Sequence, residues 1–238
     1  MNAAHPRPLI HVVAAAVLDA AGRVLIAQRP AGKHLAGGWE FPGGKLEPGE
    51  ERLAGLAREL REELGIRIEA PPRPLIRVRH AYPSRDVLLD MWVVRSFAGE
   101  PQSLDGQALR WCAIEDLGQA NLLPADEPIV ASLRLPERLS QASTPYYEIG
   151  DLHALRQQGA GAIPARRVRL QGVLCADTEE GMAAARAGAD FLVMRNALAD
   201  DELAALCAAV AVPVFARGGT LEQAWGLGAS GLNEIGEQ

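Results

Sequence analysis

The sequence predicts an α/β protein in two parts, and three observations carry this prediction. The chain has 238 residues, 48% of them hydrophobic, which is enough for two modest domains with a core each. Up to about residue 135 it contains strand-like runs, Pro/Gly turns and one strong helix. After about residue 172, apolar runs alternate with helical segments, which is typical of βα units in a parallel sheet.

In the first half, β-branched and aromatic residues mark the strands, and leucines mark the main helix. The runs expected as strands are 10–18, 24–28, 75–79 and 87–97. The helix expected over residues 53–64 places Leu53, Leu56, Leu60 and Leu64 on one face that can pack into the core, and Gly65 suits the left-handed residue that ends many helices. A second helix is expected over residues 129–135.

The second half follows a polar, proline-bounded stretch, residues 136–145, which is expected to be a linker. Its expected strands are 172–176, 191–194, 212–216 and 232–235, and its expected helices are 178–187, 201–210 and 221–227. About four such βα units fit, whereas a closed eight-unit barrel needs roughly 200 residues. The sequence therefore predicts one domain at 1–135, the linker, and a partial, barrel-like βα domain at 146–238.

Composition narrows the range of partners. The formal net charge is -6 without a long basic run, which argues against binding to polymeric nucleic acid but not to a single nucleotide. The three cysteines have no paired spacing, so neither a zinc site nor a disulfide framework is indicated, and a reduced cytoplasmic setting is expected. The apolar stretch 9–18 is interrupted by His11 and is too short to span a bilayer, so no membrane role is expected.

One helix face gathers three carboxylates. Positions three and four apart share a helix face, so Glu59 stacks near Glu62 and Glu63. Their repulsion is costly unless a cation lies among them, and hard oxygen ligands suit Mg²⁺, with Mn²⁺ as a substitute. Such an ion binds phosphate oxygens and lowers the pKa of a bound water. Arg58 can pair with Glu50 and so join the preceding loop to the helix.

The competing interpretation is an amphipathic helix with a solvated acidic face, but these residues fall in one fixed pattern. From Gly44 to Ile66 the chain matches G-x5-E-x7-R-E-U-x-E-E-x-G-U, where U is aliphatic, without a departure. Over about residues 9–135 the chain therefore resembles the MutT-type Nudix hydrolases. The resemblance implies an α/β/α sandwich that converts oxidised guanine nucleoside triphosphates to the monophosphate and pyrophosphate. Further matching segments are 28–29, 34, 39–45, 82–85, 99–101, 105–107 and 123–128.

The resemblance also implies roles for individual residues. The implied metal ligands are the Gly43 carbonyl, Glu59, Glu62, Glu63 and Asp105, which stands where the family has a Glu. Either Glu59 or Asp105 would orient or deprotonate the attacking water, and Glu50 and Arg58 complete the implied catalytic set. The implied substrate-binding residues are Arg29, His34, Phe41, Lys45, Arg85 and Asp126. Phe41 is equally well explained as a core residue, and Lys45 is equally well explained as a solvated surface cation.

Asp126 departs from the family pattern, in which an Asn can stand at this place. An Asn both donates and accepts, which suits the N7 hydrogen and the O6 acceptor of 8-oxoguanine. An ionised Asp only accepts, but burial could keep Asp126 protonated and let it donate to O6. Alternatively, the carboxylate could accept from the N1 and N2 hydrogens of guanine. The preferred base is therefore left open.

Residues 172–235 resemble the closing half of thiamin-phosphate synthase and its TenI relatives, through segments 186–191, 212–219 and 228–231. Gly218 and Gly219 follow a strand, where backbone amides could hold a phosphate. The early strands of that family, with its metal-binding acids, have no counterpart here, so a packing role is expected instead. Open sheet edges need covering, either by the first domain or by a second copy in a homodimer.

Three functions follow. The main prediction is Mg²⁺-dependent hydrolysis of oxidised purine nucleoside triphosphates such as 8-oxo-dGTP, for sanitation of the nucleotide pool. The alternatives are a Nudix hydrolase of another diphosphate, such as a thiamin diphosphate analogue, and a non-catalytic nucleotide-sensing module. Arg29, Arg85 and the region of Asp126 favour the first function over the second. The complete set of carboxylates weighs against the third, because a binder does not need all of them.

Overall fold

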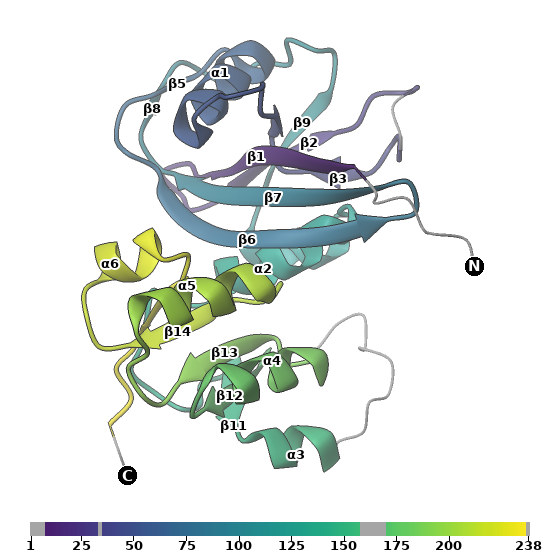
Figure 1. Ribbon diagram of the computed structural model, residues 1–238. Coiled ribbons are helices and arrows are strands. Elements are labelled where there is room, and N and C mark those ends of the chain that lie inside the picture. Colours follow the sequence, from purple (N-terminus) through teal and green to yellow (C-terminus); the bar gives the residue numbers. More distant parts are fainter. Residues whose placement is uncertain (1–7, 33–34, 158–169, 237–238) are drawn as a thin grey trace.

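The computed structural model describes residues 8–32, 35–157 and 170–236 and shows two stacked parts with one helix, α2 (Glu127–Arg134), between them (Figure 1). The strands and helices expected from the sequence are present in the expected order, with their ends displaced by a few residues. Among the described residues, no helix is both long and apolar enough to cross a membrane.

The first part is built on a mixed four-stranded sheet in the order β4-β1-β7-β6, in which β1 and β7 are parallel and the other pairs antiparallel. A second, antiparallel sheet has the order β3-β2-β9, and β5 pairs with β8. The strands are β1 (Leu9–Val17), β2 (Val24–Gln28), β3 (Trp39–Glu40), β4 (Gly43–Lys45), β5 (Arg67–Ile68), β6 (Arg73–Tyr82), β7 (Arg85–Val94), β8 (Phe97–Ala98) and β9 (Ala108–Cys112). The helices before α2 are α1 (Arg52–Leu64) and two 3-10 segments, η1 (Ile114–Gln119) and η2 (Pro124–Asp126).

Helices cover both faces of the four-stranded sheet. Leu56, Leu60 and Leu64 of α1 are fully buried against alternate residues of β1 and β7, and each contributes about 1.5–3 kcal/mol by burial. The prediction for Leu53 was wrong: it lies in the first turn of α1 and is 44% exposed. The opposite face packs against α2 through Ile129. Gly65 ends α1 at φ 68° and its amide donates to the Arg61 carbonyl, as the sequence predicts. The carboxylate-bearing helix is thus fixed by its leucines and its terminus.

The second part is a six-stranded parallel sheet in the order β10-β15-β14-β13-β12-β11. Its strands are β10 (Arg138–Leu139), β11 (Tyr147–Gly150), β12 (Leu170–Cys175), β13 (Phe191–Met194), β14 (Val214–Arg217) and β15 (Gly231–Asn233). Its helices are α3 (Leu152–Gln157), α4 (Thr178–Arg186), α5 (Asp200–Ala209) and α6 (Leu221–Gly226). One face of this sheet packs against the helices, and the other carries Tyr147, Phe191 and Phe215, whose rings meet edge to face. This inner face is therefore a packed core.

The segment expected as a linker, 136–145, differs from the prediction. Arg138 and Leu139 form β10, which pairs with β15 near the end of the chain, and Leu139 is fully buried. Farther along, the amide of Ile149 in β11 donates to the Ala142 carbonyl, so this stretch also runs beside the opposite edge strand. The local sequence does not predict this two-residue strand, because the strand with which it pairs lies almost a hundred positions away.

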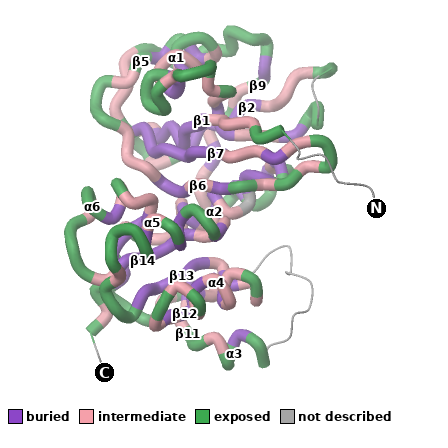
Figure 2. The backbone as a smooth tube through the Cα atoms, viewed as in Figure 1, coloured by how far each residue is buried: buried purple, intermediate pink, exposed green. Residues whose placement is uncertain are grey.

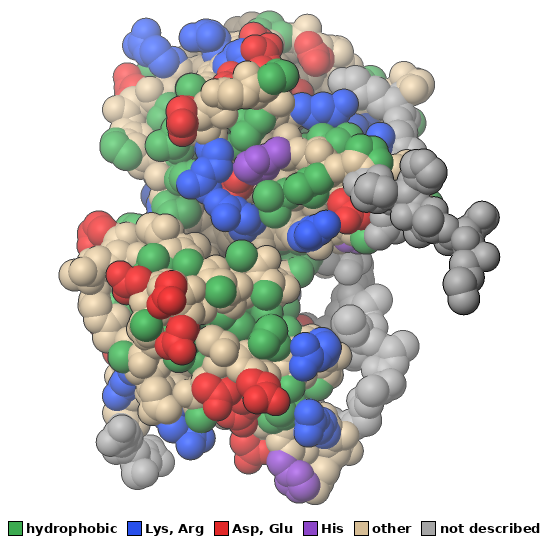
Figure 3. Space-filling model, in the orientation of Figure 1, with side chains coloured by type: hydrophobic (Ala, Val, Ile, Leu, Met, Phe, Trp, Pro, Cys, Tyr) green, Lys and Arg blue, Asp and Glu red, His purple; other side chains and the backbone are tan. Residues whose placement is uncertain are grey.

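The second part packs directly on the first. Arg73 of β6 forms an ion pair with Glu137, with Nε 2.9 Å from Oε1, and its guanidinium carbon lies 5.5 Å from the centre of the Trp225 ring in α6. Figure 2 shows buried residues both in the upper sheet and in β13 and β14, on either side of α2. Figure 3 shows basic side chains on the sheet just above the boundary and acidic ones on the helices below it. The second part therefore packs on the first, which is one of the two arrangements expected from the sequence.

Candidate active site

Arg58 fastens the loop before α1 to the helix. Its Nε and Nη2 donate to the two carboxylate oxygens of Glu50 at 2.8 and 2.9 Å, and Nη2 also donates to the Lys45 carbonyl at 3.1 Å. These bonds lower the pKa of Glu50 to about 2 and raise that of Arg58. The pair that the sequence permits is present in bidentate form, which gives directional as well as electrostatic stability.

Two of the three helix carboxylates also contact Arg58. Its Nη1 donates to Glu59 Oε1 at 2.9 Å and to Glu62 Oε2 at 3.2 Å. The Glu59 carboxylate lies against the backbone of Gly44, where an added Cβ would come within 2.3 Å of it. A side chain at position 44 would therefore displace Glu59, which explains why the loop needs a glycine here. Glu62 is more open, with 57% of its side chain exposed.

Glu63 points from the last turn of α1 toward the sheet. Its Oε2 accepts from the Gly43 amide at 3.2 Å. Burial raises its pKa to about 7, and the negative charges of Glu59, Glu40 and Asp105 add to this, while the Gly43 amide opposes it. Acidic groups from the helix, from β3 and from a loop thus act on one carboxyl group.

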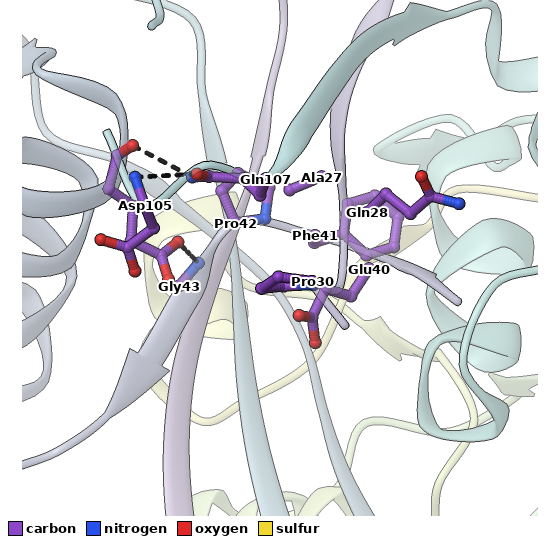
Figure 4. A pocket seen from close by; sticks show the side chains of 10 residues that line it. Ala27, Gln28, Pro30, Glu40, Phe41, Pro42, Gly43, Asp105 and Gln107 are labelled. Atoms are coloured by element: carbon purple, nitrogen blue, oxygen red, sulfur yellow. Dashed lines mark hydrogen bonds between the residues drawn. The ribbon is translucent and has the colours of Figure 1, made fainter. Parts of the chain in front are cut away.

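Gln107 connects the Asp105 loop to α1, and Figure 4 shows it beside Asp105. Its Oε1 accepts from the Asp105 amide at 3.0 Å, and its Nε2 donates to the Glu63 carbonyl at 3.1 Å. The side chain is buried. The sequence shows Gln107 only as part of a matching segment, and assigns it no role. The signal in the sequence that could have indicated its role is its position, two residues after Asp105, an expected metal ligand.

A pocket joins the carboxylate side of the site to an aromatic side (Figure 4). Its lining residues are Ala27, Gln28, Pro30, Glu40, Phe41, Pro42, Gly43, Glu63, Asp105 and Gln107. Phe41 is almost fully buried in the core of the first part and also lines the pocket, so both interpretations of this residue apply. Glu40, which the sequence did not single out, lies 3.3 Å from Arg29 through its Oε2.

Asp126, which directly precedes α2, is a buried carboxyl group on which the charge of Glu40, a residue of the pocket lining, acts. Only 4% of it is exposed, and its Oδ2 has no hydrogen-bond partner among the described residues. Burial raises its pKa well above the usual range; the negative charge of Glu40 adds to this, and the positive charge of Arg29 opposes it. The sequence left the protonation state of Asp126 open, and the structure favours the neutral acid.

Two further expected substrate residues, Lys45 and Arg85, are not among the residues that line the pocket. Lys45 has an exposed side chain, and its backbone carbonyl is what contacts Arg58. Arg85 begins β7, half-buried, and its charge acts on Tyr82, as does that of Asp126. His34 lies outside the described residues.

The expected metal ligands fit a divalent cation by chemistry more than by present geometry. Among the described residues, no three His, Cys, Asp or Glu side chains already converge as a metal cage. The reason is Arg58, which holds Glu59 and Glu62. The donors are nevertheless hard carboxylate oxygens, and burial, with the neighbouring negative charges as smaller causes, raises the pKa of Glu63, so a cation would stabilise its ionised form.

A mixed sheet between helices, with a loop and helix joined by Glu50 and Arg58 and three glutamates on that helix, defines a Nudix hydrolase. The family model described as the NUDIX domain matches residues 13–132, and the chain belongs to this family. The match ends before the second part. The resemblance of that part to thiamin-phosphate synthase stays a prediction.

Similar proteins match about half of the chain. The chain is 43% identical to the CTP pyrophosphohydrolase of Escherichia coli over 118 residues, 50% of this chain and 87% of that protein. It is 35% identical to the 8-oxo-dGTP diphosphatase of the same organism over 113 residues, 47% of this chain and 85% of that protein. The solution structure of the E. coli ORF135 protein has 41% sequence identity and a TM-score of 0.48, and the match covers 53% of this chain and 89% of that one.

Proposed function

We propose that this chain, which is a nucleoside-triphosphate pyrophosphohydrolase, acts with Mg²⁺ on oxidised purine nucleotides such as 8-oxo-dGTP. The products would be the monophosphate and pyrophosphate, and the role would be sanitation of the nucleotide pool. Relatives named 8-oxo-dGTP diphosphatase and CTP pyrophosphohydrolase support nucleotide hydrolysis at the level of the family. The observation that carries the choice of base is the burial of Asp126, which raises the pKa of this carboxyl group well above its usual range and leaves its Oδ2 without a hydrogen-bond partner among the described residues.

Nudix hydrolases generally use divalent metal ions, and the donors of this chain fit one. The residues that would hold it are the Gly43 carbonyl, Glu59, Glu62, Glu63 and Asp105. When bound, such an ion neutralises phosphate charge and lowers the pKa of an attacking water. Glu59 and Glu62 would turn from Arg58 toward it, while the bidentate Glu50 pair keeps Arg58 and the loop in place.

A carboxylate of the chain would also accept the proton of the attacking water. In-line attack at the β-phosphorus requires a base within hydrogen-bond reach, and Glu59 and Asp105 are the two candidates. Gln107 holds the backbone of Asp105 against α1, so the loop candidate is fixed relative to the helix. Arg29 and Lys45 would neutralise charge on the phosphates.

A neutral Asp126 can distinguish the oxidised base. Its carbonyl oxygen accepts from the N7 hydrogen of 8-oxoguanine, and its hydroxyl donates to O6. Unmodified guanine presents acceptors at both N7 and O6, so one of the two bonds is lost. A buried group left without a partner costs about 1–3 kcal/mol, which corresponds to a clear preference.

Cytosine is the second candidate base. It presents a donor at N4 beside an acceptor at N3, and a neutral carboxyl group matches this pair as well. The relative at 43% identity is named CTP pyrophosphohydrolase, which supports CTP or a modified cytidine triphosphate as a substrate.

A nucleotide panel with Mg²⁺, scored by pyrophosphate release, tests these proposals. It should include 8-oxo-dGTP, dGTP, CTP and dCTP, with phosphate release from thiamin diphosphate as a separate arm. The proposal predicts the highest kcat/KM for 8-oxo-dGTP. A maximum at CTP would favour the second base, and a maximum at thiamin diphosphate would overturn nucleotide sanitation. Tight nucleotide binding without turnover would indicate a sensing module.

A further inference from the structure

Helix α2 connects the base-recognition residue to the second half of the chain. Asp126 immediately precedes the helix, and Ile129 is fully buried in the core of the first half. Farther along the same helix, Ala131 and Leu135, the residue just after it, pack against the inner core of the second half. That core consists of Leu139, Tyr147, Leu170, Phe191, Val193 and Phe215. A helix only about 12 Å long is thus shared by two cores.

Strand β6 makes the same connection along a second route. At its first residue, Arg73 forms an ion pair with Glu137 and lies over the Trp225 ring, and only 18% of its side chain is exposed. At its last residue, Tyr82 packs against the core cluster that contains Ala125, the neighbour of Asp126, and β6 also contacts η2, which ends at Asp126. Within the described residues, β6 is the edge strand of its sheet and pairs with a single strand, β7.

We propose that the second half of the chain positions the base-recognition end of the active site. Arg73 and Leu135 are the positioning residues, and they act through β6 and α2. This inference rests on the proposed role of Asp126 in base recognition. If α2 lost its support, Asp126 would move relative to Arg29, and a displacement of about 1 Å is enough to cost a large factor in rate.

The experiment compares two interface variants with a matched control in the full chain. Arg73→Met removes the charge but keeps an apolar stem, and Leu135→Ala removes the contact of α2 with the second core. Arg138→Met is the control, because the ion pair of Arg138 with Glu234 is also an Arg–Glu pair but lies wholly within the second half. The measurements are the kcat/KM ratio of 8-oxo-dGTP to dGTP, and backbone amide hydrogen exchange in α1 and α2.

Both interface variants should lower the ratio by about fivefold or more, the low end of measured couplings between sites. The change should come from KM for 8-oxo-dGTP, with kcat within about twofold, because α1 and its carboxylates stay in place. Amide exchange should become faster in α2 and stay unchanged in α1. The control Arg138→Met should leave the ratio and both exchange rates unchanged.

An unchanged ratio together with unchanged α2 exchange in both variants overturns the proposal. So does equally faster exchange in α1 and α2, since that indicates general destabilisation. Asp126→Leu distinguishes failure of the proposed base recognition from failure of this inference. If this variant leaves the ratio unchanged, Asp126 does not recognise the base. Amide exchange in α2 of the interface variants then still tests whether the second half supports α2. If the first variants do not fold, Arg73→Lys and Leu135→Met replace them, and normal α2 exchange in both contradicts the inference.

Discussion

Gln107 donates from its Nε2 to the carbonyl of Glu63 at 3.1 Å, and this bond ties the loop of Asp105 to the last turn of α1. The same side chain accepts from the Asp105 amide at 3.0 Å. Gln107 is only 6% exposed, so water is a poor substitute for either partner. A residue outside the expected ligand set thus fixes the relative position of two carboxylates that are proposed to share an ion.

Replacing this amide should loosen that arrangement. In Gln107→Met the side chain keeps its length but loses both bonds, so we expect kcat to fall about tenfold because Asp105 is misplaced. The free energy of unfolding should fall by about 1–3 kcal/mol, since two hydrogen bonds of a buried side chain are lost, each contributing about 0.5–1.5 kcal/mol. Steady-state kinetics and urea denaturation measure the two effects. Gln102→Met, at an exposed position, is the control, and a normal kcat in Gln107→Met would remove Gln107 from the account.

The Glu50–Arg58 pair predicts a specific acid sensitivity. The pKa of Glu50 is lowered from 4.5 to about 2, so its ionised form stabilises the folded chain above pH 4.5, and that stability is lost as the pH falls toward about 2. Glu50→Gln should therefore lower the unfolding midpoint at neutral pH and flatten its dependence between these two values. Thermal unfolding as a function of pH measures this. Parallel curves for the two proteins would show that Glu50 does not titrate as described.

Asp126 predicts the opposite pH dependence. Its pKa is raised by burial, so the folded chain binds this proton more tightly than the unfolded chain. Ionisation therefore destabilises the fold progressively as the pH rises above the ordinary Asp value of 3.8. Asp126→Asn cannot ionise, so its advantage in stability over wild type should grow with pH. An advantage that is absent or independent of pH across the neutral range would contradict a neutral Asp126.

The same position should set base selectivity. Asp126→Asn retains one donor and one acceptor, so the preference for 8-oxo-dGTP over dGTP should survive and become independent of pH. Asp126→Leu lacks both groups, and the ratio of kcat/KM values should fall about tenfold or more. The nucleotide panel measures both variants. A preference that persists in Asp126→Leu would place base recognition elsewhere.

The parts of the fold that local patterns determine were predictable. The spacing of leucines and the glycine after them predicted α1, and the alternation of apolar runs with helical segments predicted the parallel sheet of the second half. Strand β10 was missed because its partner β15 lies at the far end of the chain. The clustering of Glu59, Glu62 and Glu63 followed from their spacing on one helix, whereas Gly43 and Asp105 entered as candidates through the family resemblance. The protonation of Asp126 and the bonds of Gln107 did not follow from the sequence, because burial and contacts between distant segments decide them.

The most direct test of the account is magnesium-dependent pyrophosphate release from 8-oxo-dGTP by wild type and by Glu62→Gln. Glu62 is exposed and its bond to Arg58 lies at the surface, so the variant should unfold at nearly the wild-type midpoint. If the glutamates of α1 hold the ion, release should fall at least about 100-fold, which corresponds to about 2.7 kcal/mol. Release near the wild-type rate, in a folded variant, would contradict the account.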